Sequence, residues 1–185
     1  MKKTFLATIC LLAGMNIHAQ QIDIQPTPQQ VKAPTHSLDM NGNYQFIGTQ
    51  EANPYAVKSL TTLLGTETSD KKGLKVIIGE RSDKAIKKYG KFIPKQEEGY
   101  FIRISPKEIV LAGNDERGTF YAVQTLAQLL EEGKLPVTEI TDYPEIRFRG
   151  VVEGFYGTPW SHQARLRHLK FYGENKMNTY IYGPK

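Results

Sequence analysis

The sequence predicts an α+β domain, a sheet covered by helices, followed by a strand–helix–strand unit with parallel strands. Three observations support this. Short apolar runs alternate with amphipathic helical patterns up to residue 143, two closely spaced strands near residue 105 predict antiparallel pairing, and residues 146–182 change to one strand, one helix and one strand. Elements in this order favour a layered structure of helices packed on a sheet.

Residues 1–19 have the pattern of a secretory signal. Two lysines precede an apolar run over residues 5–15, and Ala19 supplies a small residue at the cleavage point. The apolar run is shorter than the about 20 residues that cross a bilayer, which argues against a membrane anchor. We therefore expect an exported chain, periplasmic or secreted, that begins near Gln20 and has no transmembrane segment once the signal is removed.

Composition limits the partners of this chain. Its single cysteine, Cys10, lies in the signal, so the mature chain cannot use disulfides. The chain has 24 basic against 19 acidic residues, and loss of Lys2 and Lys3 leaves 22 against 19, a net charge of +3. The basic residues are spread along the chain without a nucleic-acid-binding motif, so we expect no nucleic-acid partner.

The domain predicted over residues 20–143 opens with a short alternating strand at 21–24. An Asn-Pro pair then starts a helix over residues 53–65, in which apolar residues recur at helical spacing before a closing glycine. An apolar run at 74–78 predicts a buried strand, and a weak helical pattern follows at 83–89.

A hairpin and a long helix complete this domain. Strands at 100–104 and 108–111 are separated by Ser-Pro-Lys, a spacing that predicts a hairpin. The helix begins after Asn114 or Asp115 as cap, and Gly133 supplies its left-handed end. Its predicted apolar face consists of Phe120, Val123, Leu126, Ala127, Leu129 and Leu130.

The pattern changes near Pro144, where we expect a domain boundary. A strand at 148–152, a helix at 161–175 and a strand at 177–182 predict one βαβ unit. The helix carries Leu166, Leu169 and Tyr172 on one side. A parallel pair of strands must be buried on both faces, and residues 144–185 are too few to cover both. We therefore expect an incomplete domain here.

Polar and aromatic residues gather where the two parallel strands end. Residues 153–157 follow the first strand and residues 183–185 the second, so both tips should lie on the same rim. At Gly154 the backbone can approach a polar ligand, Tyr156 offers a ring with a hydroxyl group, and Lys185 adds a cationic donor. These three residues are the candidate substrate-binding residues.

Several charged residues have a simpler structural interpretation. Glu153, the carboxylate closest to the tips, is expected to be a buried strand-end partner and not an acid catalyst. The charged residues 115–117 are expected to be the cap and first turn of the long helix, where acidic groups suit the helix dipole. His162 and His168 are six residues apart and do not share a helix face, so no metal site is expected.

The run "RGVVEGFYGTPWS", followed by "KFYGENKMNTYIYGPK", resembles the opening of the catalytic barrel of glycoside hydrolase family 84, the O-GlcNAcase and hyaluronidase-like β-N-acetylglucosaminidases. Upstream, "AGNDERGTFYAVQTLAQLL" is similar to the closing strand and helix of the small α+β domain that precedes the barrel in this family and, more loosely, in family 20 hexosaminidases. The resemblance covers nearly all of the mature chain.

The resemblance implies that residues 144–185 begin a (β/α)8 TIM barrel, which takes about 250 residues, so that the chain is an N-terminal fragment. It implies retaining, substrate-assisted hydrolysis of terminal β-linked N-acetylglucosamine through an oxazoline, without a cofactor. The two catalytic aspartates would lie beyond Lys185, and the fragment alone would be inactive. Gly154 would contact sugar hydroxyls, Tyr156 would lie beside the acetamido pocket, and Lys185 would hydrogen-bond the sugar of a glycan or glycoprotein substrate.

Two alternatives stay open. A family 20 hexosaminidase would share the small domain and the mechanism but would carry a different motif at the first strand end. A non-catalytic carbohydrate- or protein-interaction module would need an aromatic platform on the small domain. Its four candidate rings, Tyr44, Phe46, Tyr55 and Tyr100, are scattered along the sequence and are expected in the core.

Overall fold

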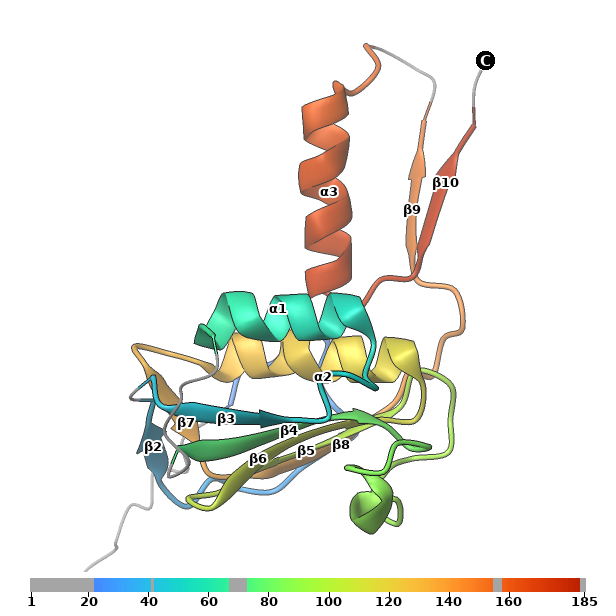
Figure 1. Ribbon diagram of the computed structural model, residues 1–185. Helices are drawn as coiled ribbons and strands as arrows, with labels where there is room; N and C mark the ends of the chain where they lie inside the picture. The colour runs from blue at the N-terminus through green and yellow to red at the C-terminus, as the bar shows by residue number, and fades with distance from the viewer. Residues whose placement is uncertain (1–21, 41, 67–72, 155–157, 184–185) are drawn as a thin grey trace, which may run out of the picture.

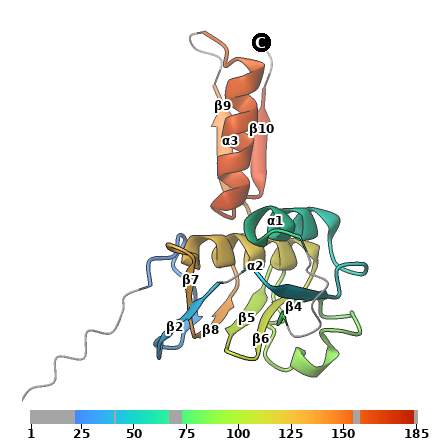
Figure 2. The ribbon, with the colours of Figure 1, turned by 60° about the vertical axis from the view of Figure 1, so that its left-hand side comes forward.

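The computed structural model describes residues 22–40, 42–66, 73–154 and 158–183. These residues form an α+β domain and, after it, a βαβ unit (Figure 1). Helices α1 and α2 lie side by side on one face of the main sheet in both views of the ribbon (Figures 1 and 2). The predicted α+β class is therefore confirmed for the first domain.

The main sheet has six strands in the order β1-β8-β5-β6-β4-β3. The pairs β1–β8, β8–β5 and β5–β6 are antiparallel, and β5 and β6 form the predicted hairpin. The pairs β6–β4 and β4–β3 are parallel. A separate antiparallel pair joins β2 (Ser37–Asp39) to β7 (Lys134–Pro136). The strands of the main sheet are β1 (Gln30–Val31), β3 (Tyr44–Ile47), β4 (Leu74–Glu80), β5 (Tyr100–Ile104), β6 (Glu108–Gly113) and β8 (Glu139–Asp142).

Both long helices of this domain begin at a side-chain cap. Helix α1 (Pro54–Leu64) starts after Asn53, whose Oδ1 accepts hydrogen bonds from the backbone N–H groups of Tyr55 at 2.9 Å and Ala56 at 3.0 Å. Helix α2 (Glu116–Leu129) starts after Asp115, which accepts from the N–H of Gly118 at 2.8 Å. Of the two caps that the sequence allows for α2, the structure selects Asp115.

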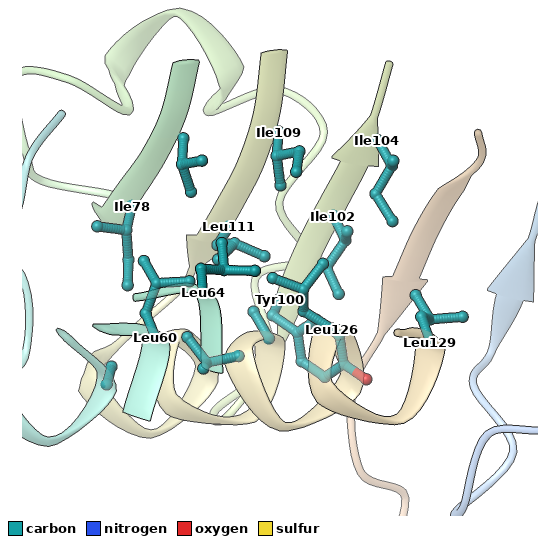
Figure 3. Close-up of a cluster of buried hydrophobic side chains, with 14 of the residues drawn as sticks. Leu60, Leu64, Ile78, Tyr100, Ile102, Ile104, Ile109, Leu111, Leu126 and Leu129 are labelled. Carbon is teal, nitrogen blue, oxygen red and sulfur yellow. The ribbon is translucent and has the colours of Figure 1, made fainter. Parts of the chain in front are cut away.

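The core lies on both faces of the sheet. The larger cluster fills the space between the sheet and the two helices, where Leu60 and Leu126 meet Ile78, Ile102 and Leu111 (Figure 3). A smaller cluster covers the opposite face beneath a single 3₁₀ turn, η1 (Lys87–Tyr89). The smaller cluster consists of Ile77, Ile86, Tyr89, Ile93, Phe101, Val110 and Ala112.

Three details of the predicted elements differ from the sequence-based expectations. Residues 22–24 form no strand, and Ile24 is instead buried in the larger core from irregular chain. The predicted helix at 83–89 is reduced to the η1 turn. Gly133, with φ 74°, does not end α2: the helix ends at Leu129, and the glycine forms a tight turn before β7.

The predictions also omitted strands β1, β2, β3, β7 and β8. On the predicted apolar face of α2, Val123, Leu126 and Leu129 are buried, whereas Phe120 and Leu130 are only partly buried and pack at the edge of the core. The face is therefore turned slightly from the expected direction.

The βαβ unit consists of β9 (Gly150–Glu153), α3 (His162–Glu174) and β10 (Thr179–Tyr182). The two strands pair in parallel, from Gly150 opposite Thr179 to Glu153 opposite Tyr182, as predicted. The unit stands above α2, and none of the residues of α3 is buried (Figure 2). One βαβ unit is common to many parallel folds, so the complete barrel stays a prediction.

Among the described residues, no helix combines the length and the apolar character needed to cross a membrane. The predicted signal at 1–19 lies outside the described residues.

Candidate functional site

The C-terminal ends of β9 and β10 lie side by side. Glu153 is the register partner of Tyr182, and both strands point away from the α+β domain (Figure 1). Gly154 follows β9, is exposed, and has open space where a side chain would stand. The other two candidate residues, Tyr156 and Lys185, lie outside the described residues.

Glu153, the last residue of β9, is a charged residue with several contacts at this end of the βαβ unit. Its side chain is buried, with 4% of the residue exposed. Arg165 of α3 donates from Nε to Oε2 at 2.8 Å and from Nη2 to Oε1 at 2.6 Å, and the Tyr180 hydroxyl of β10 donates to Oε2. A bidentate guanidinium–carboxylate pair of this kind is both strong and directional.

These contacts keep Glu153 ionised. The hydrogen bonds from Arg165, helped by those from Tyr180 and the backbone N–H of Trp160, lower the pKa of Glu153 to about 2 in spite of its burial. The same contacts raise the pKa of Arg165 and of Tyr180. A carboxylate that has lost its proton at neutral pH cannot serve as a general acid, which agrees with the predicted role as a strand-end partner.

The charged residues 115–117 are structural, as predicted, but two of them do more than start the helix. Asp115 caps α2 and also accepts from the backbone N–H of Glu98 at 2.7 Å. Arg117 Nη1 donates to Glu98 Oε1 at 3.0 Å, an ion pair that the sequence did not predict.

Glu98 connects the α+β domain to the start of the parallel strands. This residue, 4% exposed, accepts from Arg149, the residue before β9, and from Asn178 Nδ2, just before β10, at 2.8 Å, in addition to Arg117. Burial alone would raise the pKa of Glu98, but the hydrogen bonds from these three partners outweigh it and lower the pKa. No sequence pattern pairs Glu98 with residues 51 and 80 positions away.

Lys176 is a second buried charge at the junction, the contact region between the α+β domain and the βαβ unit. Its Nζ lies 3.6 Å from Asp142 Oδ2 and has no hydrogen-bond partner among the described residues. Asp142 in turn accepts from the Tyr100 hydroxyl at 2.7 Å. Burial lowers the pKa of Lys176. A cavity of about 200 Å³ lies at the junction, and its lining includes Lys176, Asp142, Tyr100, Glu98 and Arg149. It is near the first residues of β9 and β10, whereas Gly154 follows the last residue of β9.

The aromatic rings of the small domain do not all lie in the core. Tyr44 and Tyr100 are buried and Phe46 is partly buried, as expected, but Tyr55 is 73% exposed on α1. Tyr55 is the second residue of α1, and its helical position faces away from the sheet. The expectation that this ring belongs to the core was therefore wrong.

The histidines take no part in a cluster of metal-ligand type. His168 packs edge-on against Trp160, with ring centroids 4.4 Å apart, and His162 is exposed. Within the described ranges, no three His, Cys, Asp or Glu side chains come together in a way that could hold a metal ion.

Fold and site define a protein of two parts: a small α+β domain, and a parallel βαβ unit whose strand ends carry the candidate binding residues. A family model described as glycosyl hydrolase family 20, domain 2, matches residues 21–143. The chain belongs to this family. A second model, described as β-N-acetylglucosaminidase, matches residues 149–185, which are the βαβ unit and its flanking residues.

Relatives extend the same similarity over most of the chain. A β-hexosaminidase of Porphyromonas gingivalis (strain ATCC BAA-308 / W83) is 30% identical over 173 residues, which cover 80% of this chain and 22% of that protein. The solved structure of CpGH84B is 34% identical with a TM-score of 0.77 and covers 89% of this chain and 30% of that chain. A β-N-acetylhexosaminidase from Bacteroides fragilis NCTC 9343 shares the fold, with 21% identity and a TM-score of 0.68 over 86% of this chain and 32% of that one.

The chain thus spans about a fifth of the length of its curated relative and less than a third of the solved structures. The chain therefore corresponds to a part of proteins described as a β-hexosaminidase and a β-N-acetylhexosaminidase.

Proposed function

We propose that the whole protein is an exported β-N-acetylglucosaminidase that removes terminal β-linked N-acetylglucosamine from a glycan or glycoprotein. The observation that carries this proposal is the β-N-acetylglucosaminidase model, which matches the residues of the βαβ unit and both of its strand ends. In this proposal residues 20–143 are the small accessory domain and residues 144–185 begin a (β/α)8 barrel, whose strand ends bind the substrate.

The proposed chemistry is retaining and substrate-assisted. The oxygen of the sugar's own 2-acetamido group attacks the anomeric carbon and displaces the leaving group, giving an oxazoline that water then opens. The acid and base of this reaction would be two adjacent aspartates beyond Lys185. Glu153 is not a candidate for either role, because Arg165 holds it as a buried, ionised carboxylate. Residues 1–185 alone are therefore proposed to be inactive.

Three residues of this chain are proposed to contact the sugar. Gly154 would offer its backbone to sugar hydroxyls, and its exposed position at the end of β9 is compatible with that role. Tyr156 would line the acetamido pocket, and Lys185, which follows the adjacent strand end, would donate to a hydroxyl.

The specific type of hexosaminidase is a choice between two families. The structural similarity to CpGH84B, and to CpGH84D at 23% identity, supports a family 84 type. The family 20 model over residues 21–143 and the β-hexosaminidase relative support a family 20 type at least as well. We favour the family 84 type because of the Gly154–Gly157 motif at the first strand end.

The test is hydrolysis of 4-nitrophenyl N-acetyl-β-D-glucosaminide by the full-length protein that the gene encodes. We expect activity in the full-length protein and none in residues 20–185. Tyr156→Phe and Lys185→Met should raise KM if the family 84 assignment is correct, with Tyr55→Phe on the distant helix α1 as a control. Activity that these two substitutions leave unchanged would favour the family 20 type, and an inactive full-length protein would refute the proposal.

A further inference from the structure

The carboxylate of Glu153 joins three separate elements at the start of the loop between β9 and α3. Arg165 reaches it from the first turns of α3 and Tyr180 reaches it from β10, while Glu153 itself is the last residue of β9. Both carboxylate oxygens are engaged, and the residue is 4% exposed. The group is therefore not available as a direct ligand of a substrate.

The same loop is also fixed at its other end. The ring of Trp160 packs edge-on against His168 of α3, at 4.4 Å between centroids. The Arg165 guanidinium lies 5.0 Å from the centre of the Tyr182 ring, at the end of β10. Glu153, through Arg165, thus connects both strands to the helix against which Trp160 packs.

We infer that Glu153 is a positioning residue, which holds Gly154, at the end of β9, and residues 158–161, before α3, in the geometry needed to bind N-acetylglucosamine. This inference rests on the proposed function. A buried ion pair contributes little net stability compared with apolar packing, but a bidentate pair fixes direction. Fixing the backbone of a binding loop in advance is a recognised source of substrate affinity, because displacements of about 1 Å are costly.

The test compares Glu153→Gln, Glu153→Asp and a matched control, Glu174→Gln, in the full-length protein. Glu174 also forms an ion pair on α3, with Lys170, but that pair is exposed to solvent. In Glu153→Gln we expect KM for 4-nitrophenyl N-acetyl-β-D-glucosaminide to rise about tenfold, with a smaller change in kcat, because a neutral amide cannot accept from both guanidinium nitrogens. Glu153→Asp should recover part of the loss, and Glu174→Gln should match the wild type.

Two further readouts separate positioning from other roles. The pH profile of Glu153→Gln should keep both of its limbs, since positioning donates no proton; a lost limb, or an unchanged KM, would overturn the inference. Tyr180→Phe removes one hydrogen bond without a charge and should give a smaller rise in KM, which keeps the test informative if Glu153→Gln folds poorly.

Hydrogen exchange provides a readout that does not depend on activity. The backbone amides of Gly154, Thr158, Trp160 and Ser161 should exchange faster in Glu153→Gln than in the wild type or in Glu174→Gln, while those of the other described residues are unchanged. If the wild-type enzyme hydrolyses no N-acetylglucosaminide, the proposed function fails, and the exchange rates alone then decide whether Glu153 fixes the loop. Equal rates in this region would show that it does not.

Discussion

At the scale of single residues, the structure concentrates its buried charges between the two parts of the chain. Glu98 and Lys176 are each 4% exposed, and each faces a partner on the other side of the junction. Removing one partner of a buried pair leaves the other charge without compensation, and that is more costly than the pair is favourable. The junction is thus the part of the molecule most sensitive to a change of one charge.

Glu98→Gln should lower the free energy of unfolding by about 3 kcal/mol, because Arg149 keeps its partly buried charge and loses its carboxylate. Urea denaturation at neutral pH measures the difference. Glu97→Gln, at the neighbouring exposed position, is the matched control and should change little. Because the pKa of Glu98 is lowered on folding, its contribution is present above the pKa of an ordinary glutamate and is lost as the pH falls through the folded value. The two proteins should therefore converge in strong acid, and a constant difference down to that pH would contradict this account.

Lys176 gives a prediction of the same sign in a different, alkaline pH range. Burial lowers its pKa, against the attraction of Asp142, and nearby Arg149 lowers it further. Between the folded pKa and the ordinary lysine value near 10.4, the unfolded chain binds more protons, so stability rises with pH. Relative to Lys176→Met, the wild type should gain stability between pH 7 and pH 10. Lys170→Met, at an exposed lysine on α3, should show no such trend in the same urea titrations.

At the scale of elements, local sequence signals located most of the helices and the central strands. Asn53 and Asp115 are caps whose side chains identify the helix starts without tertiary information, and the spacing of two apolar runs identified the β5–β6 hairpin. The omitted strands are short or lie at sheet edges. β1 has two residues, and β2 and β7 have three each, so their pairing depends on neighbours and not on a local pattern.

Gly118 and Gly173, each inside a helix, test whether close packing or helix propensity decides the effect of a substitution. A Cβ at Gly118 in α2 would lie 2.2 Å from the carbonyl oxygen of Gly99, so Gly118→Ala should destabilise the protein by about 2 kcal/mol although alanine favours helices. Gly173 in α3 has only ring atoms of Phe120 at 3.6 Å. Gly173→Ala should therefore be neutral or stabilising by up to about 1 kcal/mol. Thermal unfolding of both variants measures the contrast, and equal effects would show that close approach does not explain Gly118.

At the scale of the whole molecule, the sequence predicted the two parts but not the way they are joined. The βαβ pattern and the resemblance identified the strand ends that carry the candidate binding residues. The junction could not be predicted, because Glu98, Arg149 and Asn178 come together only after two folded units dock. The role of Glu153 was predicted from its place at a strand end, whereas its partners Arg165 and Tyr180 required the structure.

The two parts should also differ in their ability to fold alone. The two core clusters take all of their members from residues up to Ile140, and α3 has no buried residue. Without residues 144–185, Glu98 and Asp142 would face water, which solvates their charges, so no unpaired buried charge would result. We therefore expect a protein of residues 20–143 to unfold in one cooperative transition. Circular dichroism and tyrosine fluorescence can monitor it, since this range contains no tryptophan.

A peptide of residues 144–185 should show no cooperative transition, because a single βαβ unit cannot cover both faces of its parallel strands. If residues 20–143 fail to unfold cooperatively, the junction contacts are part of the domain's own stability, and the boundary near Pro144 does not separate independent units.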